Sequence, residues 1–141
     1  MDRFQWRVSQ FVAIALMLMM MIVMAACSGS TERVFFTEPA DGATVASPVE
    51  FQMGAENFNI EPAGEINEGA GHLHILVDVD CVAAGEVIPS DDNHVHFGKA
   101  QTEAELELTP GEHKLCLQAA DGSHTALEGE GMTHEITITV E

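Results

Sequence analysis

The stretch GAGHLHILVDVD, residues 69–80, alternates apolar and polar side chains along most of its length. Successive side chains of a β-strand point to opposite faces, so this pattern predicts a strand. We expect His72 and His74 on the face directed away from the main core. The opposite, core-facing positions are Leu73, Ile75, Val77 and Val79.

A second stretch, NHVHF at residues 93–97, repeats the His-x-His spacing inside another strand pattern. Imidazole is a common ligand of zinc, copper and nickel, so two such pairs on neighbouring strands would form a metal site. Asp78, predicted on the face of the first pair, would then orient one imidazole by a hydrogen bond. The predicted ligands of zinc or copper(II) are His72, His74, His94 and His96.

The rest of the chain after Cys27 shows further alternating runs and no helical periodicity. Turns rich in Gly and Pro separate these runs, and long loops are expected at residues 58–71 and 82–93. About seven short strands within about 110 residues favour an all-β fold, an antiparallel immunoglobulin-like β-sandwich over residues 33–141.

The N-terminal segment has the pattern of a secretion signal. Arg3 and Arg7 precede an apolar run over residues 11–24, and small residues follow before Cys27. We therefore expect a signal helix at residues 1–26. The apolar run is shorter than the roughly 20 residues of a membrane-spanning helix, which leaves an uncleaved anchor as the alternative.

Residues 24–27, MAAC, resemble the lipobox of bacterial lipoproteins. The resemblance implies cleavage before Cys27, lipidation of that cysteine and a protein anchored by lipid to a membrane of the bacterial cell envelope, on its extracytoplasmic side. Residues 27–32 would then be the lipidated cysteine and a short flexible tether.

The chain is strongly acidic, with 23 Asp and Glu against five Lys and Arg and a formal net charge of −18. Such a surface repels nucleic acid and attracts cations, so no nucleic-acid partner is expected. An acidic surface that serves solubility alone is the alternative interpretation.

Cys81 and Cys116 remain as a pair in a protein that is expected to leave the cytoplasm. A disulfide between them is the economical interpretation, and ligation of a metal by either one is less favoured because extracytoplasmic thiols oxidise. Cys116 has the parity of Lys114 and Gln118, away from the core. This predicts either a bulge or a bridge at the sheet margin.

Residues 69–78, 88–103 and 106–115, which read GAGHLHILVD, IPSDDNHVHFGKAQTE and LELTPGEHKL, resemble a bacterial envelope family known as domain of unknown function number 4399. The resemblance extends over about residues 34–140. It implies a secreted or envelope-anchored module and supplies no established activity. The polar positions that match the family pattern are His72, His74, Asp78, His94, His96, Gln101, Glu103 and His113.

The remaining histidines are weaker candidates. His113 shares parity with Leu115 directly after a Pro-Gly turn, which favours a hydrogen-bonded histidine at the end of the core over a ligand. His124 lies in a turn that would close over a site. His134 is expected to cap the edge of the core.

The leading hypothesis is a lipid-anchored binding module that captures or stores zinc or copper(II) and is not an enzyme. The alternative is a non-metal interaction module for a peptide, a glycan or a partner protein, in which a hydrogen-bonded histidine network supports the loops. A metalloenzyme is the weakest hypothesis, because it needs a general base for which only Asp78 or Glu103 is a candidate.

Overall fold

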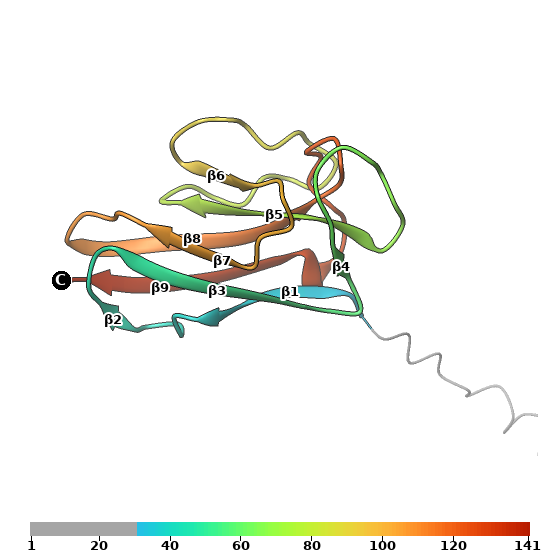
Figure 1. The fold of residues 1–141 in the computed structure, drawn as a ribbon. Coiled ribbons are helices and arrows are strands. Elements are labelled where there is room, and N and C mark those ends of the chain that lie inside the picture. The colour runs from blue at the N-terminus through green and yellow to red at the C-terminus, as the bar shows by residue number, and fades with distance from the viewer. Residues whose placement is uncertain (1–30) are drawn as a thin grey trace, which may run out of the picture.

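The computed structural model describes residues 31–141, which form two β-sheets packed face to face (Figure 1). The predicted signal at residues 1–26 and the predicted lipidation site Cys27 lie outside these residues. No helix within 31–141 is long and apolar enough to cross a membrane.

The smaller sheet has the order β1-β3-β7, with all pairings antiparallel. β1 is Arg33–Glu38, β3 is Val49–Glu56 and β7 is Glu103–Leu106. β3 alternates as the sequence predicts, because Val49, Phe51 and Met53 are buried while Glu50 and Gln52 are exposed.

The larger sheet has the order β2-β9-β8-β5-β4, and β6 also pairs with β5. The pairings among β5, β6, β8 and β9 are antiparallel, whereas the two-residue strands β2 and β4 pair in parallel with β9 and β5. The strands of this sheet are β2 (Thr44–Val45), β4 (Asn59–Ile60), β5 (Ala70–Val77), β6 (His94–Phe97), β8 (Gly111–Ala120) and β9 (Thr133–Val140).

The main core lies between the two sheets. The side chains from the smaller sheet include Phe36 and Phe51, whose ring centroids are 5.8 Å apart. β5, β8 and β9 supply the opposing layer, which includes Leu73, Leu117 and Ile138. The predicted all-β sandwich is thus confirmed, and the only helical element within residues 31–141 is the short turn η1, Glu130–Met132.

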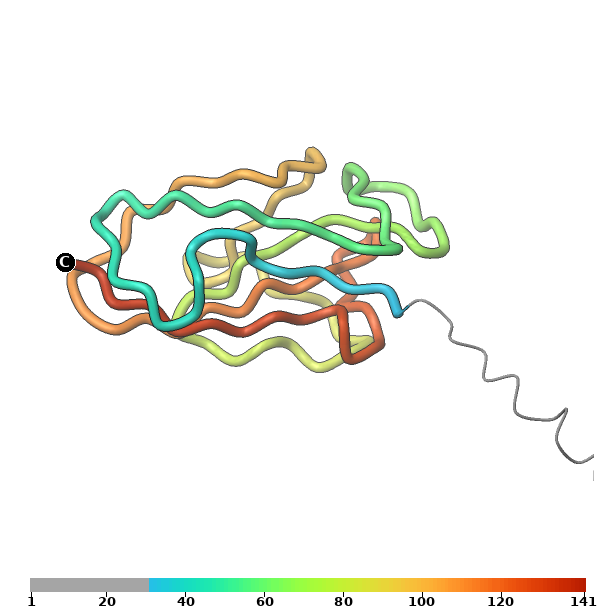
Figure 2. The backbone as a smooth tube through the Cα atoms, turned by 90° about the horizontal axis from the view of Figure 1, so that it is seen from below, coloured from blue at the N-terminus to red at the C-terminus, as the bar shows by residue number. Residues whose placement is uncertain are grey.

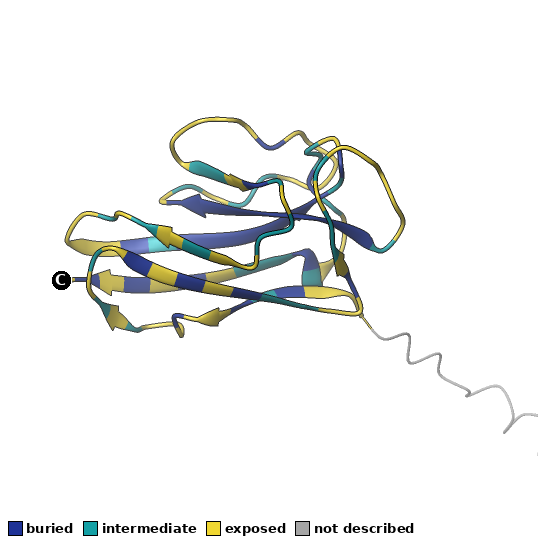
Figure 3. Cartoon of the chain, in the orientation of Figure 1, coloured by how far each residue is buried: buried dark blue, intermediate teal, exposed yellow. Residues whose placement is uncertain are grey.

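β5 is buried along its whole length, and so is the part of β8 that pairs with it, residues 115–120 (Figure 3). One face meets the main core, and the loops at residues 61–69, 78–93 and 121–129 lie around the other. The predicted strand is also too long, because β5 ends at Val77. Asp78 leaves it with a φ of +58°, so Val79 does not continue the core-facing row.

The chain enters the domain at the same end as the 61–69 and 121–129 loops, and the C-terminus lies at the opposite end (Figures 1 and 2). The predicted loop at residues 58–71 is partly strand, since β4 pairs with the start of β5. Thr31 is joined to this end of the domain, because its carbonyl accepts a hydrogen bond from Asn57 Nδ2 at 3.3 Å.

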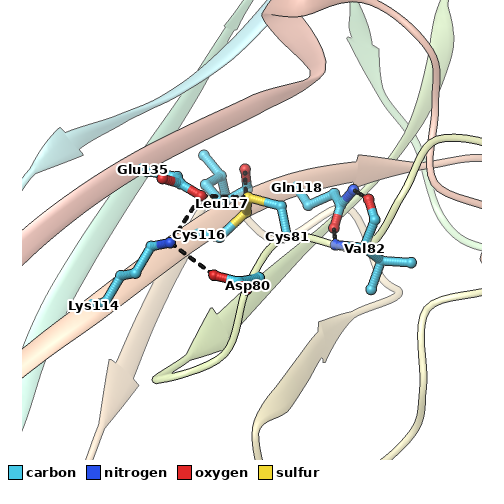
Figure 4. The surroundings of a disulfide bond; sticks show 8 residues. All are labelled: Asp80, Cys81, Val82, Lys114, Cys116, Leu117, Gln118 and Glu135. Atoms are coloured by element: carbon cyan, nitrogen blue, oxygen red, sulfur yellow. Dashed lines mark hydrogen bonds and ion pairs between the residues drawn. A yellow bond between two sulfur atoms is a disulfide. The ribbon is translucent and has the colours of Figure 1, made fainter.

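The predicted disulfide between Cys81 and Cys116 is present, with an S–S distance of 2.04 Å (Figure 4). β8 keeps an unbroken register through Cys116, so there is no bulge there. Instead, the 78–93 loop folds over the outer face of the sheet and brings Cys81 to it. Gln118 holds the same loop, because its amide donates to Val82 O at 2.7 Å and accepts from Val82 N at 2.9 Å.

Removal of this bridge should destabilise the domain by about 2–4 kcal/mol, because a covalent link restricts the unfolded chain. A double Cys81→Ala/Cys116→Ala variant and the native domain would be compared by urea unfolding. The native domain under reducing conditions serves as the control and should shift toward the variant. Identical unfolding midpoints for native and variant would show that the bridge adds no stability.

Candidate metal centre

Four histidines gather on the outer face of the larger sheet, and we call them the histidine cluster. His72 and His74 project from β5 on the side opposite Leu73, which lies in the main core. His96 on β6 is the direct partner of His74 in the β5–β6 ladder. His124 reaches the same place from the turn that follows β8.

The ring nitrogens of the cluster lie close together. His72 Nε2 and His74 Nε2 are 3.0 Å apart, and His96 Nε2 and His124 Nε2 are 3.2 Å apart. One nitrogen each from His72, His74 and His96 can be chosen so that all three lie within 4.8 Å of one another. His124 adjoins this group of three through His96, so the four rings form one continuous cluster.

The cluster has a buried floor and an accessible rim. His72 and His74 are 0% and 2% exposed, whereas His96 is exposed and His124 is half-buried. An ion would therefore reach the two buried imidazoles from the side of His96 and His124.

The two buried histidines lack the partners that a structural hydrogen-bond network would give them. His72 Nδ1 and His74 Nδ1 are buried with no hydrogen-bond partner anywhere in residues 31–141. A buried polar atom without a partner costs about 1–3 kcal/mol. Neither Nδ1 atom bonds Asp78 or any other acceptor in residues 31–141, which counts against the alternative of a hydrogen-bonded histidine network.

The buried imidazoles are neutral at physiological pH. Burial, together with the charges of the neighbouring histidines, lowers the pKa of His74 to about 3 and that of His72 to about 4. Burial and the charge of His124 also lower the pKa of His96. Since a metal binds the neutral form of imidazole, these side chains are in the ligand form without losing a proton first.

Asp121 fixes the turn that carries His124, a role that the sequence analysis missed. Its Oδ1 accepts hydrogen bonds from Ser123 N at 2.8 Å, Ser123 Oγ at 2.8 Å and Thr125 N at 3.0 Å. The negative charge of Asp121 also acts on His72, because it raises the pKa of that residue against the larger effect of burial. The run Asp-Gly-Ser-His-Thr is a recognisable turn signal, but only the fold places it beside β5.

The 61–69 loop closes beside the cluster at two points. Ala63 N donates to Gly98 O at 3.1 Å, and Gly64 N donates to Gly122 O at 2.9 Å. The loop therefore contacts the segments that carry His96 and His124.

Gly98 allows the His96 ring to occupy its position. A Cβ at residue 98 would overlap Cε1 and Nε2 of the His96 imidazole. The ring lies against the backbone of Gly98, so any side chain there would displace a member of the cluster.

His94 does not join the cluster, although the sequence ranks it above His124. Its Nδ1 lies 2.7 Å from Asp91 Oδ1, and it pairs with Leu76 in the β5–β6 ladder, two residue pairs beyond His74 and His96. The side chain of His94 therefore belongs to the turn at the start of β6. His124, the weaker candidate from the sequence, takes the fourth place.

The predicted role of Asp78 toward His72 or His74 is wrong, because Asp78 pairs with His113. His113 Nδ1 lies 2.7 Å from Asp78 Oδ2, and His113 Nε2 lies 2.8 Å from Thr109 O. Both partners are acceptors, so both ring nitrogens donate and the imidazolium form is favoured. The bond to Thr109 is the largest cause of the raised pKa of His113, and the bond and charge of Asp78 add to it.

His134 and Glu103 also lie outside the cluster. His134 Nδ1 accepts a hydrogen bond from Phe36 N at 3.1 Å and so joins β9 to β1, in keeping with a place at the core edge. Glu103 is on β7, in the smaller sheet.

The fold and the cluster define a small all-β sandwich with four imidazoles gathered on the covered face of one sheet. Residues 51–141 match the family described as Domain of unknown function (DUF4399), and the chain belongs to this family. The resemblance seen in the sequence is thereby confirmed.

Comparisons with curated proteins and with solved structures give no further information on function. None of the curated proteins matches the chain. Among solved structures, the chain is similar to the fibronectin(III)-like modules of CbhA from Clostridium thermocellum, with 20% sequence identity and a TM-score of 0.42. The match covers 77% of this chain and 95% of that one.

Substitution of His113 should give a pH-dependent loss of stability. A raised pKa in the folded state means that the stabilisation is complete below the unfolded pKa of about 6.5 and is lost as the pH rises through the folded pKa. His113→Gln should therefore be destabilised by roughly 1–2 kcal/mol at pH 5.5, and the gap to native should shrink at pH 9.

Urea unfolding of the native and His113→Gln domains across this pH range would measure the gap. Asp78→Asn is the matched control and should show the same trend, since it removes the partner charge. A gap that grows with pH would contradict the assignment of a protonated His113.

Proposed function

We propose that this domain binds a divalent transition-metal ion, zinc or copper(II), through His72, His74, His96 and His124. The observation that carries the proposal is the convergence of four imidazoles from two strands and a turn, with Nε2 pairs 3.0 and 3.2 Å apart. Zinc binds imidazole nitrogen at about 2.0–2.1 Å, so two nitrogens on one ion at tetrahedral angles are about 3.3 Å apart.

The chemical state of the cluster supports this role. The buried pair is neutral at physiological pH, because burial lowers the pKa of both imidazoles. An ion bound through Nε2 of each ring would lie between these two atoms, which are 3.0 Å apart. The formal net charge of −18 would raise the concentration of cations near the accessible rim.

The proposed place of action is the extracytoplasmic side of a bacterial membrane. The signal pattern at residues 1–26 and the lipobox-like sequence before Cys27 support a lipid anchor. The chain enters the domain at the end whose loops border the histidine cluster, so a short tether would keep that end near the membrane (Figure 1). A bound ion would then be captured or stored at the membrane surface.

A binding role fits the site better than an enzymatic one. The two carboxylates considered as general bases do not serve the cluster, because Asp78 bonds His113 and Glu103 lies on β7. Asp121 bonds the turn that carries His124. A catalytic zinc site keeps one position for water, whereas this cluster offers four protein ligands.

A second candidate function is the binding of a partner protein, a peptide or a glycan by the loops around the cluster. It is favoured by Ile66 and Val87, large hydrophobic side chains that are 66% and 65% exposed. Ile66 is on the 61–69 loop, and Val87 pairs with Thr125, next to His124. Under this function the domain would not bind zinc or copper(II).

Metal titration of the domain, purified without a histidine tag, tests the proposal. We expect native protein to bind zinc and copper(II) at micromolar concentration or below. His72→Ala and His124→Ala should each weaken binding by at least about tenfold, because each removes a ligand. Calorimetry and metal analysis after dialysis would measure this.

His94→Ala is the matched control, since it removes an imidazole outside the cluster and should bind as native does. If the native domain binds neither ion at micromolar concentration, the metal proposal fails and the interaction module stands. If His94→Ala loses binding and His124→Ala does not, the assignment of ligands is wrong.

Gly98→Ala should weaken metal binding although it removes no ligand. The added methyl group would displace the His96 ring from the cluster, and we expect affinity to fall by about tenfold or more. Calorimetry would measure affinity, and urea unfolding would establish that the variant is folded. A folded Gly98→Ala protein with native affinity would show that the position of His96 does not matter for binding.

A further inference from the structure

The separations between the four rings of the histidine cluster indicate which ion it suits, and this inference rests on the proposed function. Five of the six centroid separations lie between 4.7 and 5.0 Å. The sixth, between His74 and His124, is 5.9 Å.

These separations describe a tetrahedron more closely than a plane. Four points at the corners of a regular tetrahedron have six equal separations. Four coplanar points with five near-equal separations form a rhombus, and its long diagonal is about 1.7 times its side. This comparison matters because zinc favours tetrahedral coordination and copper(II) favours square-planar coordination. The one long separation in the cluster exceeds the others by far less than a plane requires.

The sheet positions three of the four rings, and a turn positions the fourth. His72 and His74 lie on one strand, and His96 is fixed opposite His74 by the β5–β6 register. The ring of His124 is nearly perpendicular to those of His72 and His74, at 76° and 78°. A planar arrangement would require His124 to leave this position.

The backbone of His124 is held in place before any ion arrives. Its φ of +69° is uncommon for a residue other than glycine. His124 N donates to Asp121 O at 3.0 Å, and His124 O accepts from Ile88 N at 2.9 Å. Such a conformation persists when the surroundings enforce it, and it is typical of functional sites.

We infer that the histidine cluster is a four-imidazole tetrahedral site that is selective for zinc over metals of planar or octahedral preference. Zinc has no geometric preference from its d electrons and is almost always tetrahedral when four protein side chains bind it. Copper(II) and nickel(II) favour square-planar or tetragonal surroundings, which this cluster does not supply.

The same geometry assigns a holding role to the site. Four imidazoles complete the tetrahedral coordination of zinc, so no position is left for an activated water. His96 and His124 on the accessible rim would be the ligands that an arriving ion meets first. The domain would therefore bind and release zinc itself as its cargo.

The test uses cobalt(II) and nickel(II) as probes of the geometry, with the full chain purified in detergent without a histidine tag. An unconstrained nitrogen site binds nickel(II) more tightly than cobalt(II). A tetrahedral site should reverse this order, and we expect cobalt(II) to bind about tenfold more tightly than nickel(II). Bound cobalt(II) should show the intense visible absorption of a tetrahedral complex, which zinc then abolishes by displacement.

His124→Ala is the diagnostic variant, because it leaves three imidazoles and opens one position to water. Its affinity for cobalt(II) should fall by about tenfold, and its cobalt(II) complex should lose the pH-independence of the native visible spectrum, because a metal-bound water ionises at about pH 7. His94→Ala is the matched control and should retain both properties. A native spectrum with only weak bands, together with tighter binding of nickel(II), would overturn the tetrahedral assignment while leaving metal binding intact.

Failure of the proposed function gives a different result. If cobalt(II), nickel(II) and zinc all fail to bind at micromolar concentration, the metal role itself is wrong and the geometric inference falls with it. If the ions bind and His124→Ala behaves as native does, binding stands and the fourth ligand is wrongly assigned.

Discussion

The pairing of β5 between β6 and β8 is the constraint on which the rest of the structure depends. It places Leu73 and Ile75 in the main core and turns His72 and His74 to the other face of the same sheet. A one-residue slip in this register would exchange the two faces and move imidazoles into an apolar core. The hydrophobic row of β5 thus fixes the position of the histidines as firmly as it fixes the core.

The covered outer face distinguishes this domain from a sandwich whose outer faces are open to water. The disulfide between Cys81 and Cys116 and the hydrogen bonds of Gln118 hold the 78–93 loop over β8. Ile88 and Ala126 pack with Ala120 into a small second core under these loops. The loops bury His72 and His74, and that burial is the main cause of their lowered pKa values.

The histidines of this domain follow two different physical rules. His113 has an acceptor at each ring nitrogen, so the fold stabilises its charged form. His72 and His74 are buried next to other imidazoles with no acceptor in reach of Nδ1 within residues 31–141, so the fold stabilises their neutral form. The first arrangement is a structural ion pair, and the second is the state in which imidazole binds a metal.

The sequence by itself determined the all-β class, the main core and the face of the strand that carries His72 and His74, because alternation along a strand is a local property that fixes which face a side chain takes. The family and the disulfide also followed from the sequence, from its motifs and from the pair of cysteines. Only the tertiary structure decided the partners across space. In the structure His124 and not His94 lies beside His96, Asp78 pairs with His113, and Asp121 holds the turn that carries His124. These contacts depend on where β5 ends and how the loops fold back. Asp78 and His124 have a left-handed backbone conformation that changes the direction of the chain, and the alternation of apolar and polar residues does not predict such a change.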